Sequence, residues 1–485
     1  MIGAYVELAR AHAPLLMVSV AFGAAALAML SPPRLSWFIA CAGALVSAVF
    51  AFDLAWRLLA GGGAFAFLLE GVALETDGVS VFGAALVSLT GVLALLAAGA
   101  QLGDFERRTA SVATALGLAV QTAWIGALAA RDLIGVFVAA ETAWLAAAAL
   151  LALSAERGAL NGALRMLSAG GVGAALFLVG AALIHRSAGT LDLPAIAEAH
   201  IEAADAAALG AGLIVLSLAL KAGVAPLHDW LGAGFSRANG AAAMIVGAAA
   251  VVGALTVLVR VAAYFVQAPA IGEGVSIALA VLGGASVVIG SLQAVGATNV
   301  RRLAAYAGAA QAGGVLLCVA LGSPAGVAAA LVQLTALAAT ALALFGGAAA
   351  GGVRTLEGLD GLGRRAPLAG AAMMAGAISL MGAPLTLGFL GRWRLVEAGV
   401  GAGWWWAAGA VIFASLAGVF YGGRLIERLY FRRAGEIYLG GAGAWRFAAA
   451  PLLLAAIVMT ALGVAPGLLL DAADAAAAQI LGAAA

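Results

Sequence analysis

Charged residues are scarce in this 485-residue sequence: only 10% are Asp, Glu, Lys or Arg, whereas 65% are hydrophobic. An ordinary soluble domain is roughly 25% charged and about half apolar, and even a large soluble domain needs a polar outer surface. The mean hydropathy of +1.11 is far above that range. The composition therefore excludes a water-soluble protein and predicts a chain whose surface is solvated by lipid.

Cysteine and the common cofactor motifs are also nearly absent. The two cysteines, Cys41 and Cys318, lie within apolar runs, so they predict neither a disulfide framework nor a metal site. The sequence contains no P-loop, no dinucleotide-binding glycine motif and no Cys or His cluster. We therefore predict no cofactor, no ATP hydrolysis and no redox centre in this chain. The net charge of +1 and the lack of a basic tract argue against nucleic acid as a partner.

Long apolar runs dominate the sequence. About 20 apolar residues cross a bilayer as an α-helix, whereas the strands of a membrane barrel alternate apolar and polar residues over about ten positions. The runs here are long and do not alternate, so we predict an all-α, polytopic integral membrane protein. The 14 predicted spans cover residues 13–31, 36–56, 78–99, 109–129, 132–153, 163–185, 207–227, 239–262, 274–296, 302–321, 323–348, 366–396, 403–423 and 447–470.

Arginine is unequally divided between the two sides of the predicted bundle. The side that carries the loops after odd-numbered spans holds 16 arginines, and the other side holds seven. Loops rich in Lys and Arg stay in the cytoplasm. We therefore predict that the odd-numbered loops are cytoplasmic and that both termini face the periplasm, in the inner membrane of a bacterium.

Two predicted spans contain Gly and Pro where they would interrupt a helix. The seventh ends in the stretch from Lys221 to Pro226, and the twelfth carries Gly382 and Pro384 in its middle. Interrupted helices at corresponding positions of two halves are typical of transporters built from inverted repeats. We therefore predict two inverted five-helix repeats with broken helices 7 and 12. The predicted units are residues 1–106 (spans 1–3), 107–265 (spans 4–8), 266–425 (spans 9–13) and 426–485 (span 14).

Lysine is the rarest of the charged residues, because Lys221 is the only one among 24 basic residues. It lies fourteen residues into the seventh span, roughly 20 Å along a helix that rises 1.5 Å per residue. A desolvated lysine can lose and regain a proton, whereas an arginine stays charged. Ionisable groups inside a membrane are usually functional. We predict that Lys221 carries protons; a purely structural lysine is the alternative.

Glu141 is the expected partner of this lysine. It lies nine positions after Asp132, which opens the fifth span, and is therefore about 13 Å inside the membrane. A buried glutamate and a buried lysine can pair, and any event that separates them changes which of them holds a proton. The alternative is a static ion pair without a transport role.

Five further polar positions are candidates for the same path. His228 follows the break in the seventh span and titrates near neutral pH, so it is either a proton relay or a structural residue. Arg392 follows the second break as a fixed cation, either tuning its neighbours or anchoring the helix at the membrane interface. Gln311 and Gln333, like Gln293, either hold water within the second half or join helices by hydrogen bonds.

Five stretches, in this order, resemble the antiporter-like membrane subunits of respiratory complex I and of Mrp-type sodium/proton antiporters. The resemblance covers about residues 70–430, and within the family the sequence is most similar to subunit N of bacterial NADH:quinone oxidoreductase. The Pro-Leu-His-Asp-Trp-Leu stretch is also similar to subunit M or the Mrp D subunit. The five stretches are residues 130–141, 181–193, 220–230, 299–306 and 382–392.

The resemblance implies a proton-translocating subunit that works among other membrane subunits of a redox or antiporter complex, in a lipid bilayer. Glu141 and Lys221 would be its coupled pair. Two alternatives are a D-like subunit of an Mrp-type sodium/proton antiporter, which would move Na⁺ as well, and a scaffold subunit that does not pump.

Three departures from the family pattern favour the scaffold. The family's lysine in the eighth helix falls near Val251 or Val252, where the sequence has no ionisable residue. Gln311 stands at the position of the family's histidine in the tenth helix, and Arg392 stands at the position of its lysine in the twelfth helix. The resemblance thus leaves the entry pair intact, while the later positions lack groups that readily release a proton.

Overall fold

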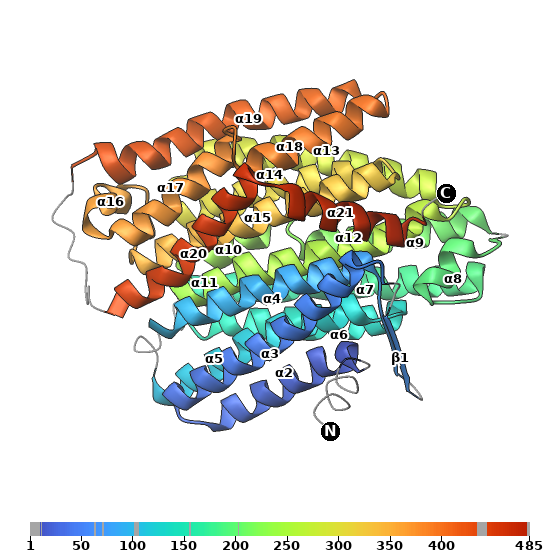
Figure 1. Ribbon diagram of the computed structural model, residues 1–485, viewed down its shortest axis with the longest axis horizontal. Helices are drawn as coiled ribbons and strands as arrows, with labels where there is room; N and C mark the ends of the chain where they lie inside the picture. The colour runs from blue at the N-terminus through green and yellow to red at the C-terminus, as the bar shows by residue number, and fades with distance from the viewer. Residues whose placement is uncertain are drawn as a thin grey trace.

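The computed structural model describes residue 10 and residues 12–62, 65–69, 72–100, 106–154, 157–201, 203–433 and 444–482. These residues are almost entirely helical, and most of the helices run side by side along one direction (Figure 1). This confirms the all-α prediction. The physical reason is that lipid offers no hydrogen bonds, so each segment must satisfy its backbone groups internally.

The helices follow the predicted spans in order. The N-terminal group is α2 (Ala13–Leu30), α3 (Pro33–Leu59) and α4 (Gly78–Ala98). The next group is α5 (Arg107–Ala129), α6 (Leu133–Ala152), α7 (Arg157–Ala188), α8 (Leu193–Glu198), α9 (Ala204–Lys221), α10 (Asp229–Arg237), α11 (Gly240–Ile245) and α12 (Val251–Gln267), with a π-helical turn at Val246–Ala250.

The second half of the chain is also helical. It consists of α13 (Gly272–Gly296), α14 (Val300–Ala320), α15 (Pro324–Ala350), α16 (Leu362–Arg365), α17 (Pro367–Met381), α18 (Leu387–Gly401), α19 (Trp405–Ile426), α20 (Ala444–Val464) and α21 (Gly467–Ile480). Short 3₁₀ and π turns lie at Glu357–Leu359 and Glu427–Phe431.

Twelve helices within the described residues are long and apolar enough to cross a membrane. The count rises to 13 if α20 and α21, which meet at an angle of 82°, form one bent span. The remaining predicted span, residues 366–396, is divided into the two 15-residue helices α17 and α18. The bend between α20 and α21 was not predicted, and α21 runs across the face that Figure 1 shows.

Both predicted breaks are present. Helix α9 ends at Lys221, and Gly223 then adopts a left-handed conformation with φ of +70°. Helix α17 ends at Met381, and Gly382 takes up the same conformation with φ of +72°. Glycine is suited to this region because it has no Cβ to clash with its backbone. The two interruptions therefore have a common local cause in the two halves of the chain.

A two-stranded hairpin lies outside the helical pattern. Strands β1 (Phe65–Leu69) and β2 (Val72–Thr76) pair antiparallel between α3 and α4. The sequence analysis predicted no strand in this connection. An antiparallel pair satisfies backbone groups between two segments, so the chain forms this hairpin in the connection between two spans.

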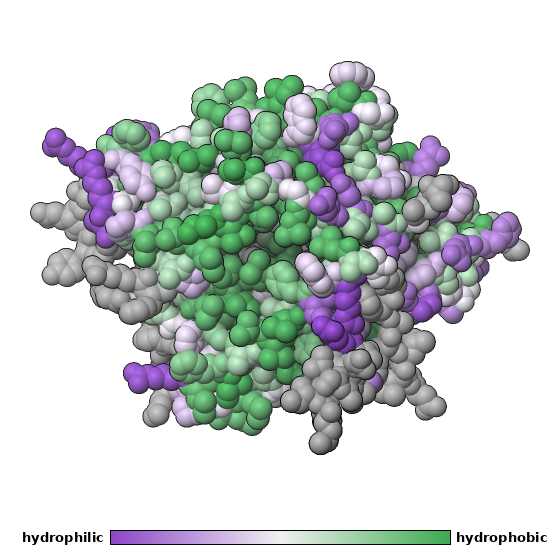
Figure 2. Space-filling view, viewed as in Figure 1, coloured by the Kyte–Doolittle hydropathy of each residue, from purple (hydrophilic) through white to green (hydrophobic). Residues whose placement is uncertain are grey.

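The most deeply buried span lies at the centre of the bundle. In the most apolar 18-residue stretch of each helix, all residues are buried in the span from Gly240 to Gln267 and 94% in α15, but only 33% in α2, α7 and α19. The outer helices present many large hydrophobic side chains, and Figure 2 shows a broad hydrophobic surface on one face. The chain is thus apolar on both its inside and its outside, as expected for a protein surrounded by lipid.

Candidate ion-translocation site

The structure brings Lys221 and Glu141 together. The Nζ atom of Lys221, at the end of α9, lies 2.9 Å from Oε1 of Glu141 on α6. The indole ring of Trp144 lies below the same ammonium group, with 4.9 Å between Nζ and the ring centroid. Glu141 and Trp144 are three residues apart on α6 and therefore project from one face of that helix. A carboxylate and an aromatic face thus meet a single ammonium group.

Two glycines on α7 create the space for this arrangement. A Cβ atom at Gly170 would lie only 2.0 Å from Nε1 of Trp144, and one at Gly173 would lie 3.8 Å from Nζ of Lys221. The Trp144 indole donates a hydrogen bond to the carbonyl of Met166, at 3.0 Å. The sequence analysis predicted no role for Trp144, although its spacing of three residues from Glu141 could have indicated one.

The two members of the pair differ in exposure. The Lys221 side chain is 1% exposed, whereas the Glu141 side chain is 18% exposed. Glu141 lies on the same stripe of α6 as Ile134, Val138 and Leu145, which are 42%, 57% and 56% exposed. The Glu141 side chain is therefore partly exposed at the lateral surface of the bundle, while its Oε1 atom and the ammonium group that it contacts are both buried.

His228 lies seven residues after Lys221, at the end of the break, and is 4% exposed. Its Nε2 atom contacts Oε1 of Gln293 on α13, and its ring packs edge-on against Tyr306 of α14, with 5.7 Å between centroids. Nδ1 is buried and has no partner among the described residues. The imidazole thus has one nitrogen engaged and one nitrogen available to an internal water.

Hydrogen bonds hold the broken segment against α13 and α14. The backbone N–H of Ala225 donates to the Ser286 hydroxyl at 2.9 Å, and that hydroxyl donates to the carbonyl of Ala309 at 2.7 Å. The Trp230 indole donates to the carbonyl of Leu220 at 3.0 Å. The break therefore has a fixed geometry rather than a free one, and it joins the two halves next to Lys221.

An open polar pocket of about 360 Å³ lies near this segment. It is formed at the start of α7 and along α10, on the side that carries the odd-numbered loops, and it reaches Tyr306, the neighbour of His228. We call it the vestibule. Its ionisable lining residues are Arg165, Asp229, Arg237, Arg302 and Tyr306.

The candidates of the second half gather around a small cavity. Gln311 of α14, Gln333 of α15 and Arg392 of α18 line it together with Tyr421 of α19. It has about 20 Å³ of space for water centres, which is room for about one water molecule. Nε2 of Gln311 and Oε1 of Gln333 are buried without partners among the described residues. Buried polar atoms of this kind normally bind water.

Arg392 is enclosed by the helix break that precedes it. Its guanidinium donates to the carbonyl of Leu380 at 2.6 Å and to the Ser415 hydroxyl at 3.0 Å. A Cβ atom at Gly382 would lie 2.4 Å from its Nη1 atom. The side chain is 9% exposed, so it lies among helices and does not extend to the surface.

The central span carries no ionisable group between the two clusters. Val251 and Val252 are buried there, and Thr256 donates its hydroxyl to the carbonyl of Val252 at 2.7 Å. The structure thus places no ionisable side chain at this position of the central span; Arg260 lies further along α12.

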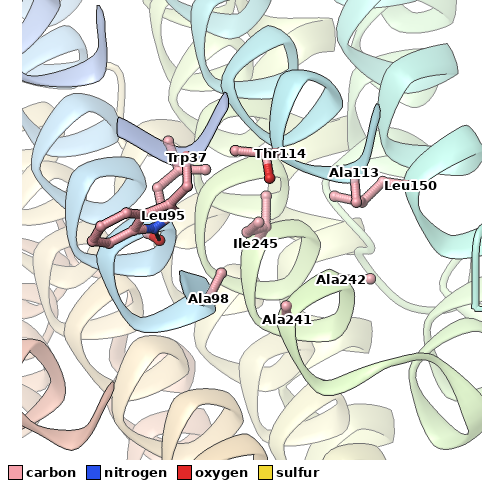
Figure 3. A pocket seen from close by; sticks show the side chains of 9 residues that line it. All are labelled: Trp37, Leu95, Ala98, Ala113, Thr114, Leu150, Ala241, Ala242 and Ile245. Atoms are coloured by element: carbon pink, nitrogen blue, oxygen red, sulfur yellow. Dashed lines mark hydrogen bonds between the residues drawn. The ribbon is translucent and has the colours of Figure 1, made fainter. Parts of the chain in front are cut away.

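A second cavity of about 20 Å³ lies where α3, α4, α5, α6 and α11 meet (Figure 3). Its two polar side chains are already engaged: the Trp37 indole donates to the carbonyl of Leu95 at 2.8 Å, and the Thr114 hydroxyl donates to that of Ala110 at 2.8 Å. The cavity is otherwise apolar, so it is not part of the candidate site.

The chain is similar to known membrane proteins. Residues 130–418 match the family described as NADH:quinone oxidoreductase/Mrp antiporter, transmembrane. The chain is 33% identical to NADH-quinone oxidoreductase subunit N of Cereibacter sphaeroides, with 95% of this chain and 98% of the relative covered. It is 30% identical to the subunit N of Desulforudis audaxviator, with 87% of each covered.

Solved structures show the same fold. A chain of the Mrp complex from Dietzia sp. matches with a TM-score of 0.85 at 24% identity, covering 98% of both chains. A chain of respiratory complex I from Thermus thermophilus matches with a TM-score of 0.79 at 25% identity, covering 94% of this chain and 98% of the other. Both neighbours are parts of multi-subunit membrane complexes.

Proposed function

Because this chain belongs to the NADH:quinone oxidoreductase/Mrp antiporter family and is homologous to subunit N over nearly its whole length, we propose that it translocates protons through the Glu141–Lys221 pair. The observation that carries the proposal is the 2.9 Å contact of a fully buried lysine with a carboxylate at the lateral surface. A lysine enclosed in this way can release its proton when its partner charge is withdrawn.

The exposure of Glu141 supports the contact with a partner subunit. A carboxylate that faces hydrocarbon is costly, so such groups normally face a partner, a cavity or another charge. We propose that another membrane subunit of the complex covers the stripe of Ile134, Val138 and Leu145, and that charge movement in this partner alters the Glu141–Lys221 pairing.

The free energy of moving a proton across the membrane is similar to that of a change in proton affinity at one group. Moving one charge against 100 mV costs about 2.3 kcal/mol. A hundredfold change in the proton affinity of one group corresponds to about 2.7 kcal/mol. If a partner subunit separates the pair and changes the proton affinity of Lys221 by this factor, the change is large enough to move one proton against 100 mV.

The route that we propose starts at the vestibule. It continues past Tyr306 to His228, whose free Nδ1 faces the interior, and from there to Lys221. In the second half, Gln311 and Gln333 hold water beside Arg392, which acts as a fixed charge. The positive-inside rule supports a cytoplasmic vestibule and periplasmic termini. The two breaks support the division into inverted repeats at residues 107–265 and 266–425.

The scaffold function remains the second candidate because a specific observation favours it. Val251, Val252 and Arg392 leave the centre and the second half without a group that readily releases a proton. A subunit that only supports its neighbours would tolerate these replacements.

Two substitutions of Lys221 separate the candidates. Lys221→Ala and Lys221→Arg should both assemble into the complex, and both should abolish proton pumping in energised vesicles, because neither side chain can cycle a proton. Arg432→Gln, at an exposed position, is the matched control and should pump normally. Normal pumping by Lys221→Arg would make the lysine a fixed charge, and normal pumping by both variants would make the subunit a scaffold.

A further inference from the structure

A buried ionic cluster lies at the hairpin end of the first half, and the proposed route does not use it. Its centre is Arg260 of α12, whose side chain is 1% exposed. The guanidinium donates from Nε to Oδ2 of Asp77 at 2.5 Å, from Nη1 to the carbonyl of Ala130 at 2.5 Å, and from Nη2 to the carbonyl of Glu75 at 3.2 Å.

Asp77 is fully engaged as well, and its side chain is 4% exposed. It caps the N-terminus of α4 by accepting from the backbone N–H of Ser80 at 2.8 Å through Oδ1. Its Oδ2 atom accepts from Arg260 and from the Tyr264 hydroxyl, which lies 3.0 Å away. Every polar atom of the carboxylate is thus held by a donor of the protein.

The cluster joins the segments that close this end. Arg131 lies 2.7 Å from Glu75 of the hairpin and also pairs with Asp192 before α8. Leu74 and Ala130 form a backbone bridge between the hairpin and the α5–α6 junction. We call the Arg260–Asp77 pair with these contacts the hairpin-end cluster; Figure 1 shows the hairpin at the end opposite α16.

The cluster contacts the segment that precedes the helix carrying Glu141. Ala130, which accepts from Arg260, precedes α6, and Glu141 lies eight residues after Leu133, the first residue of α6. That separation is about 12 Å along the helix. The vestibule opens at the other end of α6, where α7 begins. A proton on Glu141 therefore lies between two ends of the bundle. One end is open at the vestibule, and the other end is filled by the hairpin-end cluster.

We propose that the Arg260–Asp77 pair is a barrier that prevents protons from leaking between Glu141 and the hairpin side of the membrane. Proton conduction along hydrogen bonds needs groups that both accept and donate. A guanidinium has five N–H donors, no acceptor, and no accessible deprotonated form. Both oxygens of Asp77 already accept hydrogen bonds from groups of the protein, and the guanidinium beside them cannot pass a proton on, so a chain of water molecules is interrupted here.

Stability alone does not account for a buried pair at this place. Replacing a buried ion pair with apolar residues of similar volume is often neutral or stabilising. A barrier role explains why charges are present, because an arginine in a narrow passage excludes protons and cations. This inference rests on the proposed function, since it takes Glu141 to be part of the proton path.

The test uses the whole complex that contains this chain, purified and reconstituted in vesicles with a pH dye inside. A potassium diffusion potential drives protons inward without any redox substrate. The double variant Asp77→Leu/Arg260→Met removes both charges together, so that neither is left buried without its partner. We expect a passive proton leak about tenfold faster than in the parent, equivalent to about 1.4 kcal/mol of barrier.

Two further variants make the result specific. The same double variant with Glu141→Gln should return to the parent leak rate, because the route runs through Glu141. Asp53→Asn/Arg57→Gln, which removes a more exposed pair at the end of α3, should not leak. An unchanged leak in the Asp77→Leu/Arg260→Met variant would overturn the barrier, and so would a leak that persists with Glu141→Gln. Loss of pumping in Lys221→Ala is scored separately, so failure of the proposed function is distinguishable from failure of the barrier.

Discussion

The two halves of this chain contain similar helix breaks but different chemistry beside them. After α9, the break places a lysine against a carboxylate, with an imidazole seven residues further on. After α17, the break encloses an arginine beside two glutamines and a space for about one water molecule. Both halves thus contain the same kind of helix break, but the groups that can release protons lie mainly beside the first break.

The electrostatic surroundings differ accordingly. Lys221 has a carboxylate and an aromatic face, so its charge depends on what happens to Glu141. Arg392 is held by the carbonyl of Leu380 and the hydroxyl of Ser415, which are neutral groups. In the proposed mechanism, the first site responds to a partner subunit, whereas the second presents a constant charge.

The largest expected effect is that of Glu141→Gln. The amide keeps the size of the side chain but cannot hold a negative charge or take up a proton. We expect proton flux through this subunit to fall by at least about 100-fold, in the range of losing a positioned proton-transfer group. Proton uptake by vesicles with the assembled complex measures it. Retention of most of the flux would show that the pair is static.

A smaller effect is expected from Arg392→Lys and Arg392→Gln. If the second half conducts through water beside a fixed charge, the lysine variant should retain most of the flux and the glutamine variant should lose about tenfold, the kinetic equivalent of about 1.4 kcal/mol. Proton flux relative to assembled complex is the measurement. If Arg392→Gln lost as much proton flux as Lys221→Ala, the two halves would not differ in the way described above.

Trp144→Leu should weaken the site without abolishing it. The substitution removes the aromatic face from the Lys221 ammonium and leaves the carboxylate in place. A desolvated cation–π contact contributes on the order of 2 kcal/mol, so we expect a moderate loss of flux and an altered pH dependence of pumping. Trp144→Phe keeps an aromatic ring and should restore much of the flux; equal losses in both variants would mean that packing alone matters.

The smallest expected effect concerns the space behind this ring. Gly170→Ala would place a Cβ atom 2.0 Å from Nε1 of Trp144 and force the indole to move. Overpacking of this kind typically costs about 1–3 kcal/mol, measurable as a lower unfolding temperature of the purified complex. Gly171→Ala is the matched control, since no atom lies within 4 Å of its added Cβ. Equal stability of the two variants would contradict the packing described here.

Much of the candidate site was predictable because its signals are local. Lys221 is the only lysine of the chain, and it precedes a Gly and a Pro that end a helix, so its depth followed from counting residues. Glu141 followed from its distance to the start of its span. The second break was readable at Gly382 and Pro384 for the same reason.

Other parts of the site had little local signal beyond the spacing of Trp144 from Glu141. Tyr306 and Trp144 look like ordinary aromatic residues of membrane helices until α14 and α6 are packed against the break. The bend between α20 and α21 and the pairing of residues 65–69 with residues 72–76 were also not predicted. In the sequence analysis, Arg260 was only one of the seven arginines on the less basic side of the membrane, and no role was predicted for it.

By itself, the sequence determined the membrane, the helices, their order and the two interruptions, because hydrophobicity and the conformational limits of Gly and Pro act over a few neighbouring residues. The tertiary structure alone decided which charges meet. Arg260 and Asp77 are 183 residues apart, and Lys221 reaches Glu141 from another helix. A buried charge is stable only beside a partner, and that partner is set by how the helices pack.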